Sequence, residues 1–311
     1  MNMVSREQIR PAEGKREPPA RVIEGRRATP ESQVVIVVAA LLAGVAALCN
    51  VACARPLDDV VQSGAVRIGV YRDNPPFSFR RDGKLVGVDV DIGRAIAERL
   101  KLEPTYMEIT AGETVDDDLR NAVWKGHYLG GGVVDLMLSV PYDRAFAQRN
   151  PNAAFFAPYL GQEFALARSP SAADDTGLEA FRSEKIGVEL GSLPDFFLTS
   201  TLQGALRSNV VHFGTVREAA KALLAGQVAG LMATRIQLED ALSERLKDFD
   251  VSAVSMQTLG RSTWQIGIAV KEDSRDLGYA AEDILTALIA DGTMAAIFRS
   301  HGLTYRPPQS F

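Results

Sequence analysis

The same alternation of strand-like and helix-like segments occurs twice along this chain, and it restricts the fold more than any other feature. The first copy contains, in order, a β-rich run at 66–70, a helical pattern capped by Asp91, a strand at 105–109, a helix at 116–125 and an apolar strand at 133–140. A β-α-β-α-β order implies a parallel sheet with helices on both faces, so the sequence predicts an α/β fold.

The second copy begins with the letters K-I-G-V at 185–188, which echo R-I-G-V at 67–70. Its further predicted elements are a helix after Gly191-Ser192, a strand at 210–212, a helix capped by Thr215 and a strand at 229–233, followed by a strand at 266–270 and helices at 281–290 and 293–300. Two α/β units in 311 residues favour two domains over one.

Composition excludes several function classes. The net charge of −5 gives no basic footprint for nucleic acid. Both cysteines, Cys49 and Cys53, lie in one apolar segment near the start of the chain, and there are only three histidines. The sequence therefore predicts no disulfide, no metal site and no cofactor in the rest of the chain.

The apolar segment at 34–54 carries no charge, follows Arg26-Arg27 and ends in Ala52-Cys53-Ala54. A basic region, an apolar run and a small-x-small end are typical of an export signal. We expect cleavage before Arg55 and a periplasmic protein, with a polar extension at 1–33. The alternative is a retained anchor, because 21 uncharged residues are long enough to span a bilayer.

Six short motifs stand in a recognisable order. They are N-P-P-F-S-F at 74–79, G-K-L-V-G-V-D-V-D-I at 83–92, F-A-P-Y at 156–159, I-G-V-E-L-G-S at 186–192, I-G-I-A-V at 266–270 and A-D-G-T at 290–293. In this order and spacing they resemble the bacterial extracellular solute-binding proteins, family 3. The resemblance runs from about residue 66 to residue 301.

The resemblance implies a type II periplasmic binding protein, in which two α/β lobes are joined by two crossing strands. Lobe I would comprise 66–164 and 262–305, and lobe II would comprise 165–261. The implied protein is a monomer and not an enzyme, binds a small molecule in the cleft between its lobes and works with an ABC-type permease. Its contact with the membrane would be limited to the N-terminal segment.

Four positions depart from the amino-acid-binding members that the chain resembles. Asn74 and Asp116 stand where those members have aromatic residues that stack on the ligand. Leu193 replaces a threonine that binds the ligand carboxylate, and Thr234 replaces the aspartate that pairs with the ligand ammonium. A buried charge needs a partner, so an α-amino acid is a poor expectation for the ligand.

The carboxylate-binding features are better retained. Arg144 matches the arginine that grips the ligand carboxylate, and Gly191-Ser192 begins a helix whose N–H groups suit an anion. We therefore expect a small, anionic organic ligand. The full set of expected ligand-binding residues is Asn74, Phe77, Asp116, Ser139, Arg144, Gly191, Ser192, Thr234 and Arg235.

Two other functions stay open. The loop at 138–143 resembles a branch of the family associated with periplasmic quinoprotein methanol or alcohol dehydrogenases, which would make the chain an accessory protein with a dehydrogenase or cytochrome partner. Periplasmic dehydratases share the implied fold and need a general acid, for which Glu163 and Glu189 are the candidates. The glycine-rich insertion at 124–132 has no assigned role.

Overall fold

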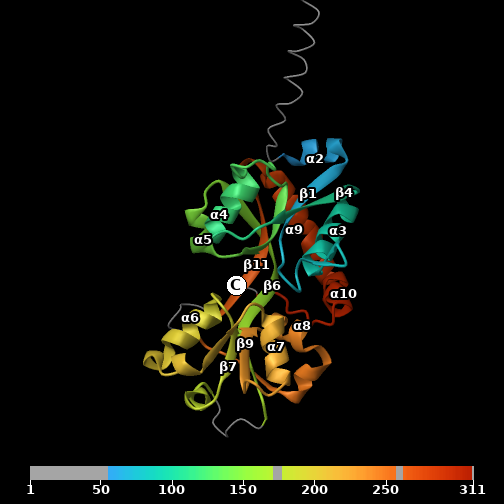
Figure 1. Ribbon diagram of the computed structural model, residues 1–311. Helices are drawn as coiled ribbons and strands as arrows, with labels where there is room; N and C mark the ends of the chain where they lie inside the picture. Colours follow the sequence, from blue (N-terminus) through green and yellow to red (C-terminus); the bar gives the residue numbers. More distant parts are fainter. Residues whose placement is uncertain (1–54, 171–176, 257–261, 310–311) are drawn as a thin grey trace, which may run out of the picture. The chain divides into compact units, whose positions relative to one another are not determined.

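Three parallel strands build the first part of the sheet. Strand β1 (Ala65–Tyr71) lies between β4 (Glu103–Ile109) and β5 (Leu136–Pro141). The structure, a computed structural model, describes residues 55–170, 177–256 and 262–309, all within one compact unit of the chain, Val51–Phe311. The predicted parallel β-α-β-α-β order is confirmed (Figure 1).

A hairpin and a helix connect β1 to β4. Strands β2 (Phe79–Arg81) and β3 (Lys84–Val86) pair antiparallel across Asp82-Gly83, as the dipeptide predicts. The helix α3 (Val88–Leu100) begins three residues before the predicted cap Asp91, so that prediction is wrong. Gly87 precedes the helix with φ 132°, and a Cβ there would lie 2.2 Å from the Phe77 carbonyl oxygen, so glycine sets this start.

Two long antiparallel strands cross the middle of the sheet. Strand β6 (Ala153–Arg168) has sixteen residues and pairs with β11 (Thr263–Lys271) from Ala153 to Glu163. Beyond that point β6 pairs with β9 (Gly230–Thr234) and with the short β10 (Asp250–Ala253). One strand therefore belongs to both parts of the sheet.

The second part repeats the first with fewer strands. Strand β7 (Ile186–Glu189) lies parallel between β9 and β8 (Val210–Phe213). The helices here are α6 (Leu193–Ser200), α7 (Val216–Leu224) and α8 (Arg235–Leu242). The predicted cap Thr215 accepts a hydrogen bond from the Glu218 N–H at 3.2 Å, so this prediction is confirmed.

Helices cover both faces of the first part of the sheet. One face packs on α3, α9 (Arg275–Ala290) and α10 (Thr293–Ser300), and the other packs on α4 (Val115–Leu119), the π-helical turn Arg120–Trp124 and α5 (Arg144–Arg149). The short α2 (Leu57–Ser63) leads into β1. Apolar side chains on both faces explain why β1 and β5 are almost entirely buried.

The predicted N-terminal extension at 1–33 and the apolar segment at 34–54 lie outside the described residues. In the part of the chain that is described, no helix combines the length and the apolar character needed to cross a bilayer.

Gly278 in α9 offers a test of the helix packing. A Cβ at this position would lie 2.2 Å from Cε2 of Phe156 on β6. Gly→Ala in a helix normally stabilises by about 1 kcal/mol, but overpacking a core costs about 1–3 kcal/mol. We expect Gly278→Ala to lower the free energy of unfolding in urea. Thr286→Ala, on the exposed side of the same helix, should not, and adding Phe156→Leu should reduce the loss. A more stable Gly278→Ala protein would contradict this packing.

Candidate ligand site

A cavity of about 440 Å³ opens where β1, β4 and β5 end, and we call it the strand-end cavity. Its walls are Tyr71 at the end of β1 and Arg72–Asn74 after it, Ala111–Val115 after β4, Asp118 of α4, Ser139 and Pro141 of β5, and Trp264 and Ile266 of β11. Open α/β sheets bind ligands beyond the carboxyl ends of their strands. This cavity is therefore the candidate ligand site.

Asp118 supplies the most deeply buried charge in the cavity wall. It is 3% exposed and accepts hydrogen bonds from the Tyr71 hydroxyl at 2.8 Å and from the Gly112 N–H at 2.7 Å. Burial raises the pKa of Asp118, while these two hydrogen bonds lower it. Burial, followed by the charge of Asp118, raises the pKa of Tyr71, so Tyr71 remains a hydrogen-bond donor. A carboxylate held in this way can accept a donor group of a ligand.

Ser139 stands on a buried polar network below the cavity. Its hydroxyl donates to Oδ2 of Asp89 at 2.6 Å, and the Tyr159 hydroxyl donates to Oδ1 of the same carboxyl at 3.0 Å. The Ser139 N–H donates to the Tyr159 hydroxyl at 2.9 Å. Ser139 has φ 58°, a conformation that costs an ordinary residue about 1–2 kcal/mol. These hydrogen bonds hold the strained backbone in place.

Charged side chains at the rim make the cavity acidic on balance. Asp73 and Glu113 are exposed at the rim and Asp118 lies deeper, whereas Arg72 is the one basic residue among the lining side chains described. An acidic wall favours a cationic or hydrogen-bond-donating part of a ligand, while Arg72 can receive an anionic part. This balance differs from the purely anionic ligand that the sequence predicts.

Of the nine expected ligand-binding residues, only Asn74 and Ser139 line this cavity. Phe77 is 5% exposed and packs in the hydrophobic core with α3. The Asp116 carboxylate accepts a hydrogen bond from the Asn150 amide at 2.7 Å, which ties α4 to the end of α5. Phe77 and Asp116 thus serve packing and helix attachment.

Arg144 lies at the first position of α5, where Asp143 caps the helix by accepting a hydrogen bond from the Phe146 N–H at 2.9 Å. Its side chain is exposed and lines none of the cavities described here. Arg144 therefore lies outside the lining of the strand-end cavity.

Gly191 and Ser192 form the start of α6 without reaching the strand-end cavity. The Ser192 hydroxyl caps the helix by accepting from the Asp195 N–H at 3.3 Å and donates to the Glu189 carbonyl at 2.7 Å. The Asp195 carboxylate accepts from the Gly191 N–H at 2.9 Å and contacts His212 Nε2 at 2.9 Å. The Gly191 N–H, which the sequence assigns to a ligand anion, thus donates to the Asp195 carboxylate instead.

Thr234 and Arg235 lie at the end of β9. The Thr234 hydroxyl and the Gln237 side chain form a reciprocal cap at the start of α8. Arg235 pairs with Glu163 of β6, so its guanidinium has an internal acidic partner. Both side chains therefore already have partners within the chain.

The sequence interpretation missed Tyr71, Arg72 and Asp118. Tyr71 and Arg72 directly follow the first predicted strand, where ligand-binding side chains of parallel sheets gather. Their place directly after this strand is the sequence signal that could have identified them. Asp118 is one of three consecutive aspartates, and the sequence alone does not tell which of them points inward.

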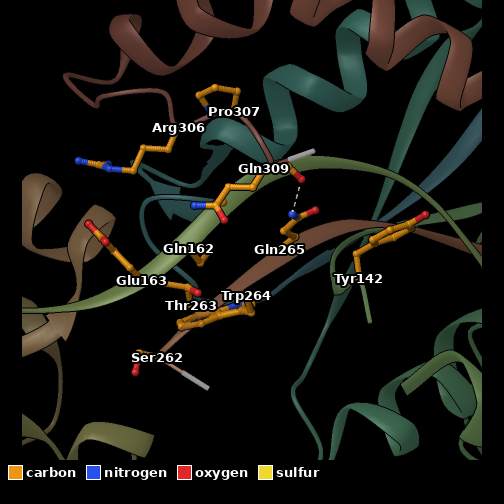
Figure 2. A pocket seen from close by; sticks show the side chains of 11 residues that line it. Tyr142, Gln162, Glu163, Ser262, Thr263, Trp264, Gln265, Arg306, Pro307 and Gln309 are labelled. Carbon is orange, nitrogen blue, oxygen red and sulfur yellow. Dashed lines mark hydrogen bonds between the residues drawn. The ribbon is translucent and has the colours of Figure 1, made fainter. Parts of the chain in front are cut away.

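Two further cavities are present. One, of about 360 Å³, is lined by β6, β11 and the chain segment 306–309, and we call it the hinge cavity (Figure 2). The other, of about 330 Å³, includes Glu189 at the end of β7 and Arg217 of α7, and we call it the β7-end cavity. Trp264 lines both the strand-end cavity and the hinge cavity. Among the described residues, no group of three His, Cys, Asp or Glu side chains could hold a metal ion.

Comparison with known proteins agrees with this arrangement. Residues 66–124 match the family model of the bacterial extracellular solute-binding proteins, family 3. The L-arginine-binding protein of Pseudomonas aeruginosa is 27% identical over 230 residues, 73% of this chain and 83% of the relative. The L-cystine-binding protein TcyJ of Escherichia coli is 23% identical over 243 residues, 78% of this chain and 84% of the relative.

Solved structures show the same fold. An ancestral cationic amino acid solute-binding protein, AncCDT-1, matches with a TM-score of 0.61 at 18% identity, over 78% of this chain and 98% of that one. The substrate-binding protein AbpA of Streptococcus pneumoniae, bound to L-arginine, matches with a TM-score of 0.54 at 19% identity, over 79% of this chain and 97% of that one.

The fold is therefore that of the type II periplasmic binding proteins, with two α/β lobes joined by two crossing strands, β6 and β11. The family model and the two relatives support the resemblance to the family 3 solute-binding proteins that the motifs indicate.

The network below the cavity gives a pH prediction. Burial raises the pKa of Asp89 to about 6 from 3.8, against the hydrogen bonds from Ser139 and Tyr159. Because the folded protein holds this proton more tightly than the unfolded chain, Asp89 favours folding below about pH 4, and this contribution is lost as pH rises through about 6. We expect wild-type stability relative to Asp89→Asn to fall by about 2 kcal/mol between pH 4 and pH 7 in urea titrations. A difference that stays constant across this range would contradict the raised pKa.

Proposed function

We propose that this chain is a periplasmic solute-binding protein that delivers a small organic ligand to an ABC-type importer. The observation that carries the proposal is the strand-end cavity, where a buried carboxylate and an arginine line the wall together with β11, one of the two crossing strands. Movement of two lobes about such strands can enclose a solute. We assign 66–164 with 262–305 to lobe I and 165–261 to lobe II, and the segment at 34–54 to export.

The ligand chemistry follows from the charges of the cavity wall. We assign the anionic group of the ligand to Arg72, in place of Arg144, because Arg72 lines the cavity and Arg144 does not. Asp118 would accept an N–H or O–H donor at the other end of the ligand. The proposed ligand therefore carries both an anionic group and a donor, as hydroxy acids and amino acids do.

The relatives named above bind L-arginine and L-cystine, and each of these ligands has an amino and a carboxylate group. This chain has Thr234 as a helix cap at the position expected for an ammonium-binding aspartate. Asp118 offers a carboxylate from the opposite lobe. The chain could therefore take a ligand of the same general chemistry in a different orientation.

A thermal-shift panel of hydroxy acids, amino acids and dicarboxylates tests this proposal. A ligand at a hundred times its Kd stabilises the protein by about 2.7 kcal/mol, a shift of a few degrees. We expect hits that carry both an anionic group and a donor, and none with glutarate, which lacks a donor at neutral pH. With the best hit, calorimetry should show affinity lowered at least tenfold in Arg72→Ala and in Asp118→Asn.

Arg144→Ala is the matched control, because it removes the same charge from an exposed helix start. Its affinity should equal that of the wild type. Loss of binding in Arg144→Ala with retention in Arg72→Ala would overturn the assignment of the anion site. Failure of every solute would instead favour the accessory role beside a quinoprotein dehydrogenase.

One observation favours a dehydratase as the second candidate function. Glu189 is half-buried in the β7-end cavity, and burial raises its pKa, as a general acid requires. One structural neighbour is described as an ancestral precursor of cyclohexadienyl dehydratase. Glu163, the other candidate acid, is already paired with Arg235.

A turnover assay separates the two functions. The binding proposal predicts no aromatic product when the protein is incubated with a cyclohexadienyl acid and followed by ultraviolet absorbance. Product formation that is lost in Glu189→Gln and retained in Glu113→Gln would establish the dehydratase instead.

A further inference from the structure

The hinge cavity lies where the two crossing strands meet the C-terminal segment of the chain. The Gly161 N–H on β6 donates to the Arg306 carbonyl at 3.0 Å, and the Tyr305 hydroxyl donates to the Tyr159 carbonyl at 2.9 Å. These bonds hold the segment across β6. The cavity of about 360 Å³ is thus lined by β6, by β11 and by the C-terminal segment (Figure 2). That volume lies within the range of small-molecule sites.

Gln265 of β11, which lines this cavity, has a side-chain acceptor without a partner in the part of the chain that the structure describes. Its side chain is 8% exposed, and its Nε2 donates to the Gln309 carbonyl at 2.8 Å. Oε1 is buried and has no hydrogen-bond partner among the described residues. Figure 2 shows the amide nitrogen directed to Gln309 and the amide oxygen turned away from it. A buried acceptor left unpaired is destabilising, so a donor from a ligand would be favoured here.

The charged groups of the cavity wall are already neutralised by partners within the chain. Glu163 pairs with Arg235, and the Arg306 guanidinium lies 2.6 Å from the buried Glu239 carboxylate. An ion entering the cavity would have to compete with these pairs. The wall therefore favours a neutral ligand.

Aromatic side chains give the cavity a flat apolar surface. Trp264 and Tyr142 both line it, and Pro307 lines it from the C-terminal segment. The Trp264 ring is packed against Phe164, with ring centroids 4.7 Å apart, which fixes the indole plane. A planar ligand can stack on such a surface.

We propose that the hinge cavity is a second binding site, which takes a small, neutral, planar molecule whose N–H donates to Oε1 of Gln265. This inference does not rest on the proposed function, because the strand-end cavity takes its ligand through Arg72 and Asp118. A negative binding result at one of the two cavities therefore leaves the proposal for the other standing.

Benzamide is a suitable probe, since it is neutral and planar and carries two N–H donors. Acetophenone is the matched compound without an N–H donor, because it is also neutral and planar and has a methyl group in place of the amide nitrogen. In ¹⁵N-resolved NMR titrations of the protein we expect benzamide to shift the Gln265 side-chain amide resonances and to bind at least tenfold more tightly than acetophenone. Equal binding of the two probes, or no binding of either, would overturn the proposal.

Variants locate the interaction. Gln265→Leu keeps the size of the side chain and removes both the Oε1 acceptor and the Nε2 donor to Gln309, so its preference for benzamide over acetophenone should disappear. Gln148→Leu makes the same change at an exposed position of α5 and should keep the preference. A preference that survives in Gln265→Leu, or shifts confined to residues of the strand-end cavity, would place the benzamide site elsewhere.

Discussion

The hydrogen-bonded pairing of β6 with β11 is the constraint on which the rest of the structure depends. The backbone of β6 is satisfied by β11 along its first eleven residues and by β9 and β10 beyond them. A strand with buried backbone groups must keep such partners along its whole length. The two lobes are thus joined by the same ladder that forms the centre of the sheet, and both the strand-end cavity and the hinge cavity take their walls from it.

One irregular position in the pairing of β11 shapes the candidate site. The pairing of β5 with β11 shifts between Gly267 and Ala269, opposite the point where Ser139 takes a positive φ. Gly267 also faces β6: a Cβ on it would lie 2.6 Å from the Phe156 carbonyl oxygen. The strands β11 and β6 therefore approach this closely only because residue 267 is glycine. The buried Asp89 then anchors Ser139 and Tyr159 below the cavity.

Local signals in the sequence predicted local structure well. The Asp82-Gly83 hairpin and the Thr215 cap depend on neighbouring residues only, and both are confirmed. The sixteen-residue length of β6 escaped prediction because the strand is buried on both faces and shows no alternating pattern. Whether Arg144 and Asp118 face the cavity depends on the length of a loop and on the direction in which a helix presents its side chains. Short motifs do not encode either property, so the proposed anion site is Arg72 and not Arg144.

Trp264 lines both the strand-end cavity and the hinge cavity. An occupant of one cavity that displaces the indole ring alters the space and the contact surface in the other. Thermodynamic linkage requires such an influence to be reciprocal: whatever factor one occupant imposes on the affinity of the second, the second imposes on the first. If both proposed sites bind, Trp264 couples the occupancy of the hinge cavity to that of the strand-end cavity.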